Sequence, residues 1–97
     1  MNKENYLELI KTADVYSVAK VSPLDHVELI SEHLENKIFL KREDLQKTFS
    51  FKIRGAVNKL KQLQKDSVSK GVICSSAGNH AQGVAQQRNL QNSMLLL

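Results

Sequence analysis

The sequence predicts an α/β fold with a parallel sheet, because short apolar runs alternate with helical segments from residue 38 onward. Ile38-Phe39-Leu40 and Val72-Ile73-Cys74 are β-prone runs of the kind found in buried parallel strands. Each run precedes a segment whose apolar residues recur at helical spacing. This alternation is typical of an α/β architecture with right-handed crossovers. Two strands make only an incomplete parallel sheet with flanking helices, so the 97 residues look like the beginning of something larger.

Two helices are expected before the first of these strands. Residues 4–13, ENYLELIKTA, carry apolar side chains at helical spacing. Residues 25–35 begin with D-H-V-E, a capping-box pattern in which Asp25 is the N-cap and Glu28 follows three residues later. Asn36 is a suitable helix stop.

Two further helices are expected after the strands. Ser50 is a good N-cap for the first of them, and Lys70-Gly71 separates this helix from the second strand. Residues 75–78 are small and predict a tight turn, after which a helix begins at Asn79. The apolar residues at helical spacing are Ile53, Val57, Leu60 and Leu63 in the first helix, and Ala81, Val84, Ala85 and Leu90 in the second.

Composition indicates one small globular domain. The chain is 41% hydrophobic and 25% charged, which is ordinary for a soluble globular protein, and it lacks low-complexity segments. Its one cysteine, Cys74, excludes an internal disulfide and a cysteine-based zinc cluster, and fits the reducing cytoplasm. We expect no metal, no secretory signal and no membrane-spanning segment.

The net charge of +4 is unevenly distributed. Residues 1–36 carry a net charge of −4, whereas residues 37–70 carry +7. A basic half can bind nucleic acid or another polyanion, but a solvated helix face explains such a charge run more often. No nucleic-acid motif accompanies the basic segment, so we expect no nucleic-acid partner.

A ligand site is expected where the two strands end. In open α/β sheets, ligands bind beyond the carboxyl ends of the strands and near helix N-termini. Residues 41–52 follow the first strand and residues 75–80 follow the second. If these strands pair in parallel, Lys52 and the Ser76–Asn79 turn face the same edge of the sheet.

Lys52 is a candidate reactive amine. It lies between Phe51 and Ile53 in the first turn of its helix, so it is expected to be partly withdrawn from water. Apolar neighbours and the positive end of the helix dipole should both lower its pKa. A lysine of lowered pKa is suited to Schiff-base chemistry with a carbonyl cofactor. The commoner alternative is a lysine that extends its amine into solvent.

The residues around the second turn can be interpreted either as structural residues or as a ligand site. Ser76-Ala77-Gly78-Asn79 could present backbone N–H groups to a carboxylate at a helix N-terminus, or could be a turn with an N-cap. His80 alone fits a hydrogen-bonded helix residue better than a catalyst. Cys74 reads as a small buried strand residue, and Glu43 and Asp44 as polar loop residues.

Three motifs at these positions resemble those of the threonine dehydratases, also called threonine deaminases. They are K-R-E-D-L-Q at 41–46, F-S-F-K-I-R-G-A at 49–56 and S-A-G-N-H-A-Q-G-V-A at 76–85. These enzymes belong to the fold-type II (tryptophan synthase β-like) pyridoxal-phosphate-dependent group, with serine dehydratase and serine racemase. The resemblance covers about residues 4–85, and K-R-E-D-L-Q with F-S-F-K is more similar to the biosynthetic, isoleucine-pathway enzyme than to the degradative one.

The resemblance implies residue roles around pyridoxal 5′-phosphate. Lys52 would hold the cofactor as a Schiff base and, once freed by the substrate, would remove the substrate α-proton. Phe51 would line the cofactor pocket, and Asn79 would hydrogen-bond the 3-hydroxyl oxygen of the ring. The cofactor would act as the electron sink.

The resemblance also implies a substrate. Ser76, Gly78, Asn79 and His80 would form the loop that takes the substrate carboxylate, largely through backbone N–H groups. The implied reaction converts L-threonine to 2-oxobutanoate and ammonia, with L-serine left open as a substrate. The complete enzyme would be a cytoplasmic homotetramer. A serine dehydratase or serine racemase is an alternative, as is a non-catalytic remnant or interaction fragment.

The sequence also departs from the family pattern. The family holds the cofactor phosphate in a glycine-rich loop further along its chain, whereas the glycines here, Gly55, Gly71, Gly78 and Gly83, stand singly. Residues 86–97 form a divergent tail. We therefore expect residues 1–97 to be a partial N-terminal segment of the catalytic domain, truncated and inactive by itself.

Overall fold

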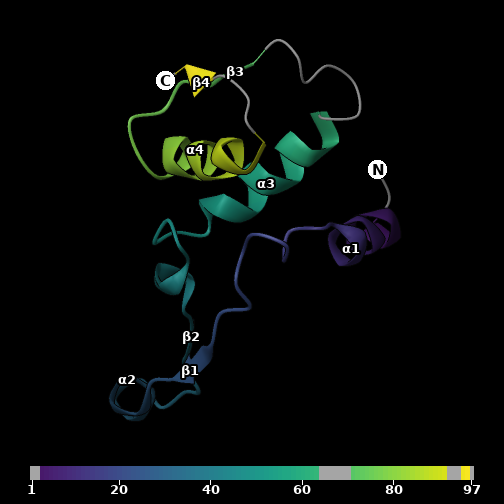
Figure 1. The fold of residues 1–97 in the computed structure, drawn as a ribbon. Coiled ribbons are helices and arrows are strands. Elements are labelled where there is room, and N and C mark those ends of the chain that lie inside the picture. The colour runs from purple at the N-terminus through teal and green to yellow at the C-terminus, as the bar shows by residue number, and fades with distance from the viewer. Residues whose placement is uncertain (1–2, 64–70, 92–94, 97) are drawn as a thin grey trace.

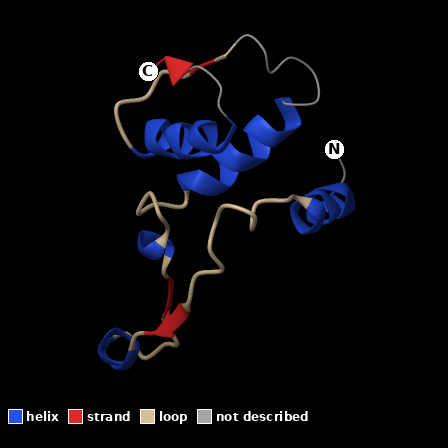
Figure 2. Cartoon of the chain, viewed as in Figure 1, coloured by secondary structure: helices blue, strands red, loops and turns tan. Residues whose placement is uncertain are grey.

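The computed structural model describes residues 3–63, 71–91 and 95–96. Helices dominate this part of the chain, and the strands are short (Figure 2). In chain order the elements are α1 (Lys3–Thr12), β1 (Leu24–His26), α2 (Glu28–His33), β2 (Phe39–Lys41), the 3₁₀ turn η1 (Glu43–Leu45), α3 (Lys52–Leu63), β3 (Val72–Ile73), α4 (Asn79–Gln91) and β4 (Leu95–Leu96).

The elements form three groups in space (Figure 1). Helices α3 and α4 pack against each other, with β3 and β4 beside them. The β1–β2 hairpin and α2 lie at the far end of the molecule, and α1 lies to one side of α3. The helix pair is therefore the centre of the described structure.

The α/β class is confirmed, but the strands pair differently from the expected order. β2 pairs antiparallel with β1, from Leu24 opposite Lys41 to His26 opposite Phe39. β3 instead forms a short parallel pair with β4. The partner of β2 is near in sequence, and closing a short loop costs less conformational entropy than closing a long one. Leu24–His26 was overlooked because only one of its three residues is strongly apolar.

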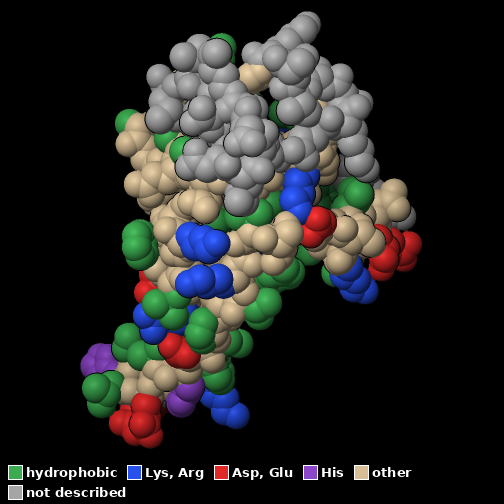
Figure 3. All heavy atoms as spheres, in the orientation of Figure 1, with side chains coloured by type: hydrophobic (Ala, Val, Ile, Leu, Met, Phe, Trp, Pro, Cys, Tyr) green, Lys and Arg blue, Asp and Glu red, His purple; other side chains and the backbone are tan. Residues whose placement is uncertain are grey.

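The expected burial of the strand residues is wrong. Phe39 is 50% exposed, Leu40 49% and Ile73 78%. A two-stranded sheet buries a face only where another element covers it. Hydrophobic side chains therefore lie openly in Figure 3, over the lower part of the molecule where Figure 1 places the hairpin.

Asp25 is not the N-cap of α2, so the predicted capping box is wrong. Val27 occupies that position, with φ −101° and ψ 92°, and makes no capping hydrogen bond through its side chain. Asp25 lies within β1 and pairs with Leu40. Its carboxylate accepts a hydrogen bond from Arg42 Nη1 at 3.0 Å. Strand pairing has overridden the local capping pattern.

The predictions for the other helices are confirmed. Helix α1 covers the first predicted helical segment, and α4 begins at Asn79. Ser50 caps α3, because its Oγ accepts the Lys52 N–H at 3.0 Å. Lys70 and the side chain of Leu90 lie outside the described residues.

Helix α3 supplies the largest share of the buried core. One cluster joins Ile53 and Val57, both 0% exposed, to Val18 and Ala19. The other joins Ala56 and Leu60 of α3 to Val84 of α4, with Val72 and Cys74 packed against them. The same helix thus connects the N-terminal segment to the C-terminal elements.

Gly83 lets α4 approach the start of α3 closely. A Cβ added at Gly83 would lie 3.2 Å from Ala56 Cβ, and 3.3 Å from both Ile53 Cα and the Lys52 carbonyl oxygen. Two of these three atoms belong to the α3 backbone, so they cannot move without displacing the helix. A side chain at this position would push the helices apart.

The described helices do not include one with both the length and the apolar character needed to cross a membrane.

Two glycine-to-alanine substitutions test this packing. A Cβ at Gly55, in the interior of α3, would meet nothing within 4 Å. We expect Gly55→Ala to raise the free energy of unfolding by about 0.5–1 kcal/mol, because alanine loses less backbone entropy in a helix. Gly83→Ala should give no such gain or should destabilise the chain, which urea unfolding followed by circular dichroism will measure. Equal stabilisation by both would contradict the close helix contact.

Candidate functional site

Lys52 is the first residue of α3, and its side chain is exposed. The expected withdrawal of this amine from water is therefore wrong. Helical geometry turns successive side chains by about 100°, so the neighbouring Ile53 points into the core while Lys52 points outward. The amine lies over the Phe51 ring, with Nζ 5.2 Å from the ring centroid. Lys52 is accessible to a dissolved carbonyl compound.

The turn before α4 is held by its own serine. Ser76 Oγ accepts hydrogen bonds from the N–H groups of Gly78 and Ala81, each at 3.3 Å. The hydroxyl thus caps the helix. Gly78, Asn79 and His80 are exposed, and no hydrogen-bond partner of the Asn79 and His80 side chains is found in the described part of the chain. These residues are free to meet a ligand at the helix N-terminus.

Helix packing brings Lys52 and the 76–80 turn to the same end of the helix pair. A Cβ added at Gly83 would lie 3.3 Å from the Lys52 carbonyl oxygen, so Gly83 lies beside the start of α3. Asn79 lies about one helical turn before Gly83, about 6 Å along the axis. Figure 1 shows α3 and α4 starting on the same side of the pair. The sequence predicted this proximity from a parallel pairing of two strands, whereas the structure produces it through the α3–α4 contact.

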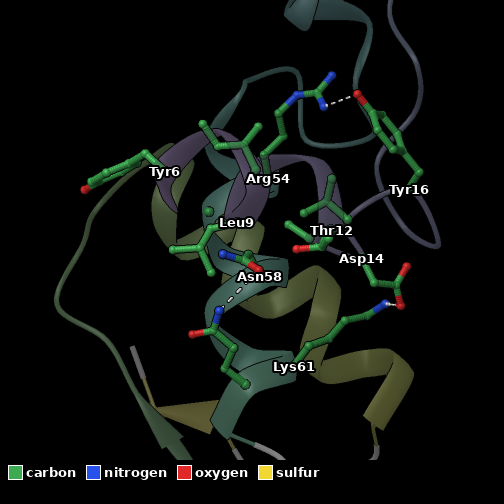
Figure 4. A pocket seen from close by; sticks show the side chains of 13 residues that line it. Tyr6, Leu9, Thr12, Asp14, Tyr16, Arg54, Asn58 and Lys61 are labelled. Carbon is green, nitrogen blue, oxygen red and sulfur yellow. Dashed lines mark hydrogen bonds and ion pairs between the residues drawn. The ribbon is translucent and has the colours of Figure 1, made fainter. Parts of the chain in front are cut away.

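A hollow in the described surface lies away from these residues. A pocket with a volume of about 1140 Å³ lies between α1 with the segment after it and the outer face of α3 (Figure 4). Neither Lys52 nor the 76–80 turn contributes to it. Its lining residues are Tyr6, Leu9, Ile10, Thr12, Ala13, Asp14, Val15, Tyr16, Arg54, Gly55, Asn58, Lys61 and Gln62.

Glu43 is the centre of a polar network that the sequence reading missed, since it took this residue for a polar loop residue. Its Oε1 accepts hydrogen bonds from Arg54 Nη2 at 2.6 Å, Arg54 Nε at 3.1 Å and Ser22 Oγ at 2.7 Å. Its Oε2 accepts one from Gln46 Nε2 at 3.0 Å. The signal that could have revealed the network is that Glu43 and Arg54 belong to different motifs and carry opposite charges.

The network fastens three separated segments together. Gln46 is 1% exposed, and its side-chain amide donates to the Lys20 carbonyl and accepts from the Lys20 N–H. Arg54 donates to the Tyr16 hydroxyl at 3.0 Å, the contact marked by a dashed line in Figure 4. The segment before β1, the η1 turn and α3 are thus joined through side chains.

Hydrogen bonds between oppositely charged side chains shift the pKa values in this region. The Arg54 guanidinium, helped by Ser22 and Gln46, lowers the pKa of Glu43 to about 2, against the partial burial that opposes it. The hydrogen bonds that Arg54 donates to Glu43 raise the pKa of Arg54 in turn. On the exposed side of the turn, Arg42 lowers the pKa of Asp44 through a second hydrogen-bonded pair.

The comparison with protein families shows which family the chain belongs to. Residues 16–87 match the family described as "Pyridoxal-phosphate dependent enzyme". The match covers Lys52 and the 76–80 turn. The chain belongs to this family.

Within this family, the chain is similar to curated proteins named threonine dehydratases. The chain is 58% identical over 80 residues to the tomato (Solanum lycopersicum) protein "Threonine dehydratase 1 biosynthetic, chloroplastic". It is 51% identical over 85 residues to a biosynthetic L-threonine dehydratase of Burkholderia multivorans. These matches cover 82% and 88% of the chain, but only 13% and 17% of the relatives. The chain thus spans a small part of the length of its relatives.

Solved structures share the fold. The processed form of threonine deaminase isoform 2 from Solanum lycopersicum matches 98% of the chain with a TM-score of 0.85 and 43% identity, over 27% of its own chain. Serine racemase from Dictyostelium discoideum matches 92% of the chain with a TM-score of 0.85 and 33% identity, over 30% of its own chain. The fold-type II assignment is thereby confirmed.

The Glu43 network gives stability a defined pH dependence. The lowered pKa means that Glu43 stabilises the fold above the unfolded value of about 4.5, and that this contribution is lost as the pH falls toward about 2. The fall in pKa corresponds to about 3 kcal/mol before solvent screening, and the side chain is only 15% exposed. Glu43→Gln should therefore lower the free energy of unfolding at pH 7 by about 2–3 kcal/mol, and the difference from the parent should shrink below pH 4.5.

Glu32→Gln is the matched control, because Glu32 is exposed and its carboxylate has no partner among the described residues. Urea unfolding across the pH range measures both variants. A difference for Glu43→Gln that stays constant from pH 7 to pH 2.5, or one no larger than that of Glu32→Gln, would contradict the network's electrostatic role.

Proposed function

We propose that the chain is part of an L-threonine ammonia-lyase, which converts L-threonine to 2-oxobutanoate and ammonia, and that Lys52 is its cofactor-binding lysine. The observation that carries the proposal is the 50–58% identity to enzymes named threonine dehydratases, over a segment that contains both Lys52 and the 76–80 turn. The biosynthetic names of these relatives support a place in isoleucine biosynthesis.

The residues present fit the aldehyde and ring end of pyridoxal phosphate. An exposed primary amine on a helix start is what a carbonyl group needs for covalent attachment, and Lys52 supplies it. Phe51 offers an aromatic wall beside that amine, and Asn79 has a free amide at the same end of the helix pair. The described glycines stand singly, and Gly55 and Gly83 lie within helices, so the described residues form no glycine-rich phosphate loop.

Each residue has a defined task in the proposed reaction. Pyridoxal phosphate, when bound, supplies an electron sink for the negative charge that develops at the substrate α-carbon. Lys52 takes the α-proton, and it can do so only with its amine unprotonated. The N–H groups of the 76–80 turn that are not bonded to Ser76 bind the substrate carboxylate, and Ser76 stabilises the turn through its hydrogen bonds from Gly78 and Ala81. Loss of the β-hydroxyl and hydrolysis of the released product complete the conversion.

The serine racemase similarity supports a second candidate. Two serine racemase structures, from Dictyostelium discoideum and maize, match the chain at 33% identity. L-Serine is therefore the alternative substrate, and serine dehydration or racemisation the alternative reaction. The higher identity to threonine dehydratases favours L-threonine.

The proposal also includes the extent of the catalytic domain, the oligomeric state and the cellular location. We assign residues 4–85 to the catalytic domain and residues 86–97 to a tail of lower similarity. We propose a homotetramer for the complete enzyme. Cys74, unpaired and half-buried, is compatible with the reducing cytoplasm, although relatives bear chloroplastic and mitochondrial names.

A chimeric enzyme tests the function. Residues 4–85 replace the matching segment of the Burkholderia multivorans relative, and formation of 2-oxobutanoate from L-threonine is measured. We expect the chimera to be active and Lys52→Ala to reduce kcat about a thousandfold or more, because the proton-transferring amine is gone. Lys59→Ala, which removes an exposed amine from the same helix, should leave kcat close to that of the chimera.

The substrate on which the chimera acts distinguishes between the candidate functions. A folded chimera that acts on L-serine alone would favour the serine enzymes. A folded chimera without activity toward either amino acid would favour a non-catalytic remnant and overturn the proposal.

A further inference from the structure

We propose that Arg54 and Glu43 are positioning residues for Lys52: their ion pair fixes the first turn of α3 and thereby the point from which the Lys52 amine reaches its carbonyl partner. This inference rests on the proposed function and adds two residues that do not touch the cofactor or the substrate. Its basis is the placement of the ion pair relative to Lys52.

Lys52 and Arg54 leave α3 on nearly opposite sides. Each residue turns the helix by about 100°, so two residues separate the side chains by roughly 200°. Ile53 lies between them and is 0% exposed. Arg54 and the buried Ile53 thus hold this turn on two sides, while the Lys52 amine lies over the Phe51 ring on the side away from Arg54.

The Arg54 contact is suited to holding a backbone in place. The guanidinium binds Glu43 Oε1 through two nitrogens, at 2.6 and 3.1 Å, and reaches the Tyr16 hydroxyl at 3.0 Å. The two paired side chains are 26% and 15% exposed, so water screens them weakly. A planar, forked donor on a shielded carboxylate fixes orientation as well as distance.

Glu43 is itself fixed from two further directions. Ser22 and the buried Gln46 both donate to its carboxylate. Gln46 is bound in turn to the backbone of Lys20. The position of the α3 start is therefore defined by segments on both sides of the β1–β2 hairpin.

A second tie on α3 provides a control for stability alone. Lys61 Nζ binds both Asp14 and Ser17, so it too connects α3 to the segment after α1 (Figure 4). It lies about 14 Å along the helix axis from Lys52. Removing either tie should weaken the fold, but only the Arg54 tie belongs to the turn that carries Lys52.

The test measures where pyridoxal phosphate attaches. The chimeric enzyme, which carries residues 4–85 within the complete relative, is incubated with pyridoxal phosphate and borohydride, and the ratio of adduct at Lys52 to adduct at the exposed Lys59 is read by peptide mass. The parent should favour Lys52. Arg54→Met should lower the ratio about tenfold or more, because a displaced amine loses the advantage of orientation. Lys61→Met should leave the ratio unchanged.

Further variants test the same inference if Arg54→Met does not fold. Arg54→Lys, which retains the charge but loses the fork, should lower the ratio by a smaller factor, and Glu43→Gln should lower it as well. Glu43→Asp, which retains the carboxylate, should restore part of the ratio relative to Glu43→Gln.

Two results would overturn the inference, and they differ in what they mean for the proposed function. If Arg54→Met and Lys61→Met change the ratio equally, or neither changes it, the ion pair only stabilises the fold and the proposed function is unaffected. If the parent shows no preference for Lys52, the assignment of Lys52 as the cofactor lysine fails, and the inference fails with it.

Discussion

The described structure depends most on the ion pair between Glu43 and Arg54. Burying charged groups is costly unless each finds partners. Apart from the local bond from Gln46 to Glu43, the side-chain contacts of the pair join segments that are separated in the sequence. Arg54 draws α3 toward the segment around Tyr16, while Glu43 holds the η1 turn against Ser22. The apolar cluster around Ile53 forms where these segments meet. Polar and apolar packing therefore support each other at the start of α3.

The sequence predicts the helices well because their signals are local. Apolar periodicity and the Ser50 cap specify α3, and small residues before Asn79 specify the start of α4. Strand pairing was not predictable in the same way, since a run such as Ile38-Phe39-Leu40 does not encode its partner. The Asp25 capping pattern failed for the same reason: β1 gains ladder hydrogen bonds that no local pattern reveals.

The proximity of Lys52 and the 76–80 turn was predicted correctly, but its physical cause was not. Lys52 and the 76–80 turn do lie at one end of a helix pair, but the close contact at Gly83, not a shared sheet edge, brings them there. The expected burial of Lys52 failed because a neighbouring apolar residue in sequence is not a neighbour in space on a helix. The Glu43–Arg54 pair escaped notice because an attraction across separated motifs has no characteristic spacing.

The exposed faces of the strands affect how the chain interacts with other proteins in a cell. Phe39, Leu40 and Ile73 present large apolar side chains to water on short strands. Surfaces of this kind are what chaperones retain and proteases sample, and they also favour self-association through sheet edges. Covering those strands with another surface would therefore reduce both kinds of contact.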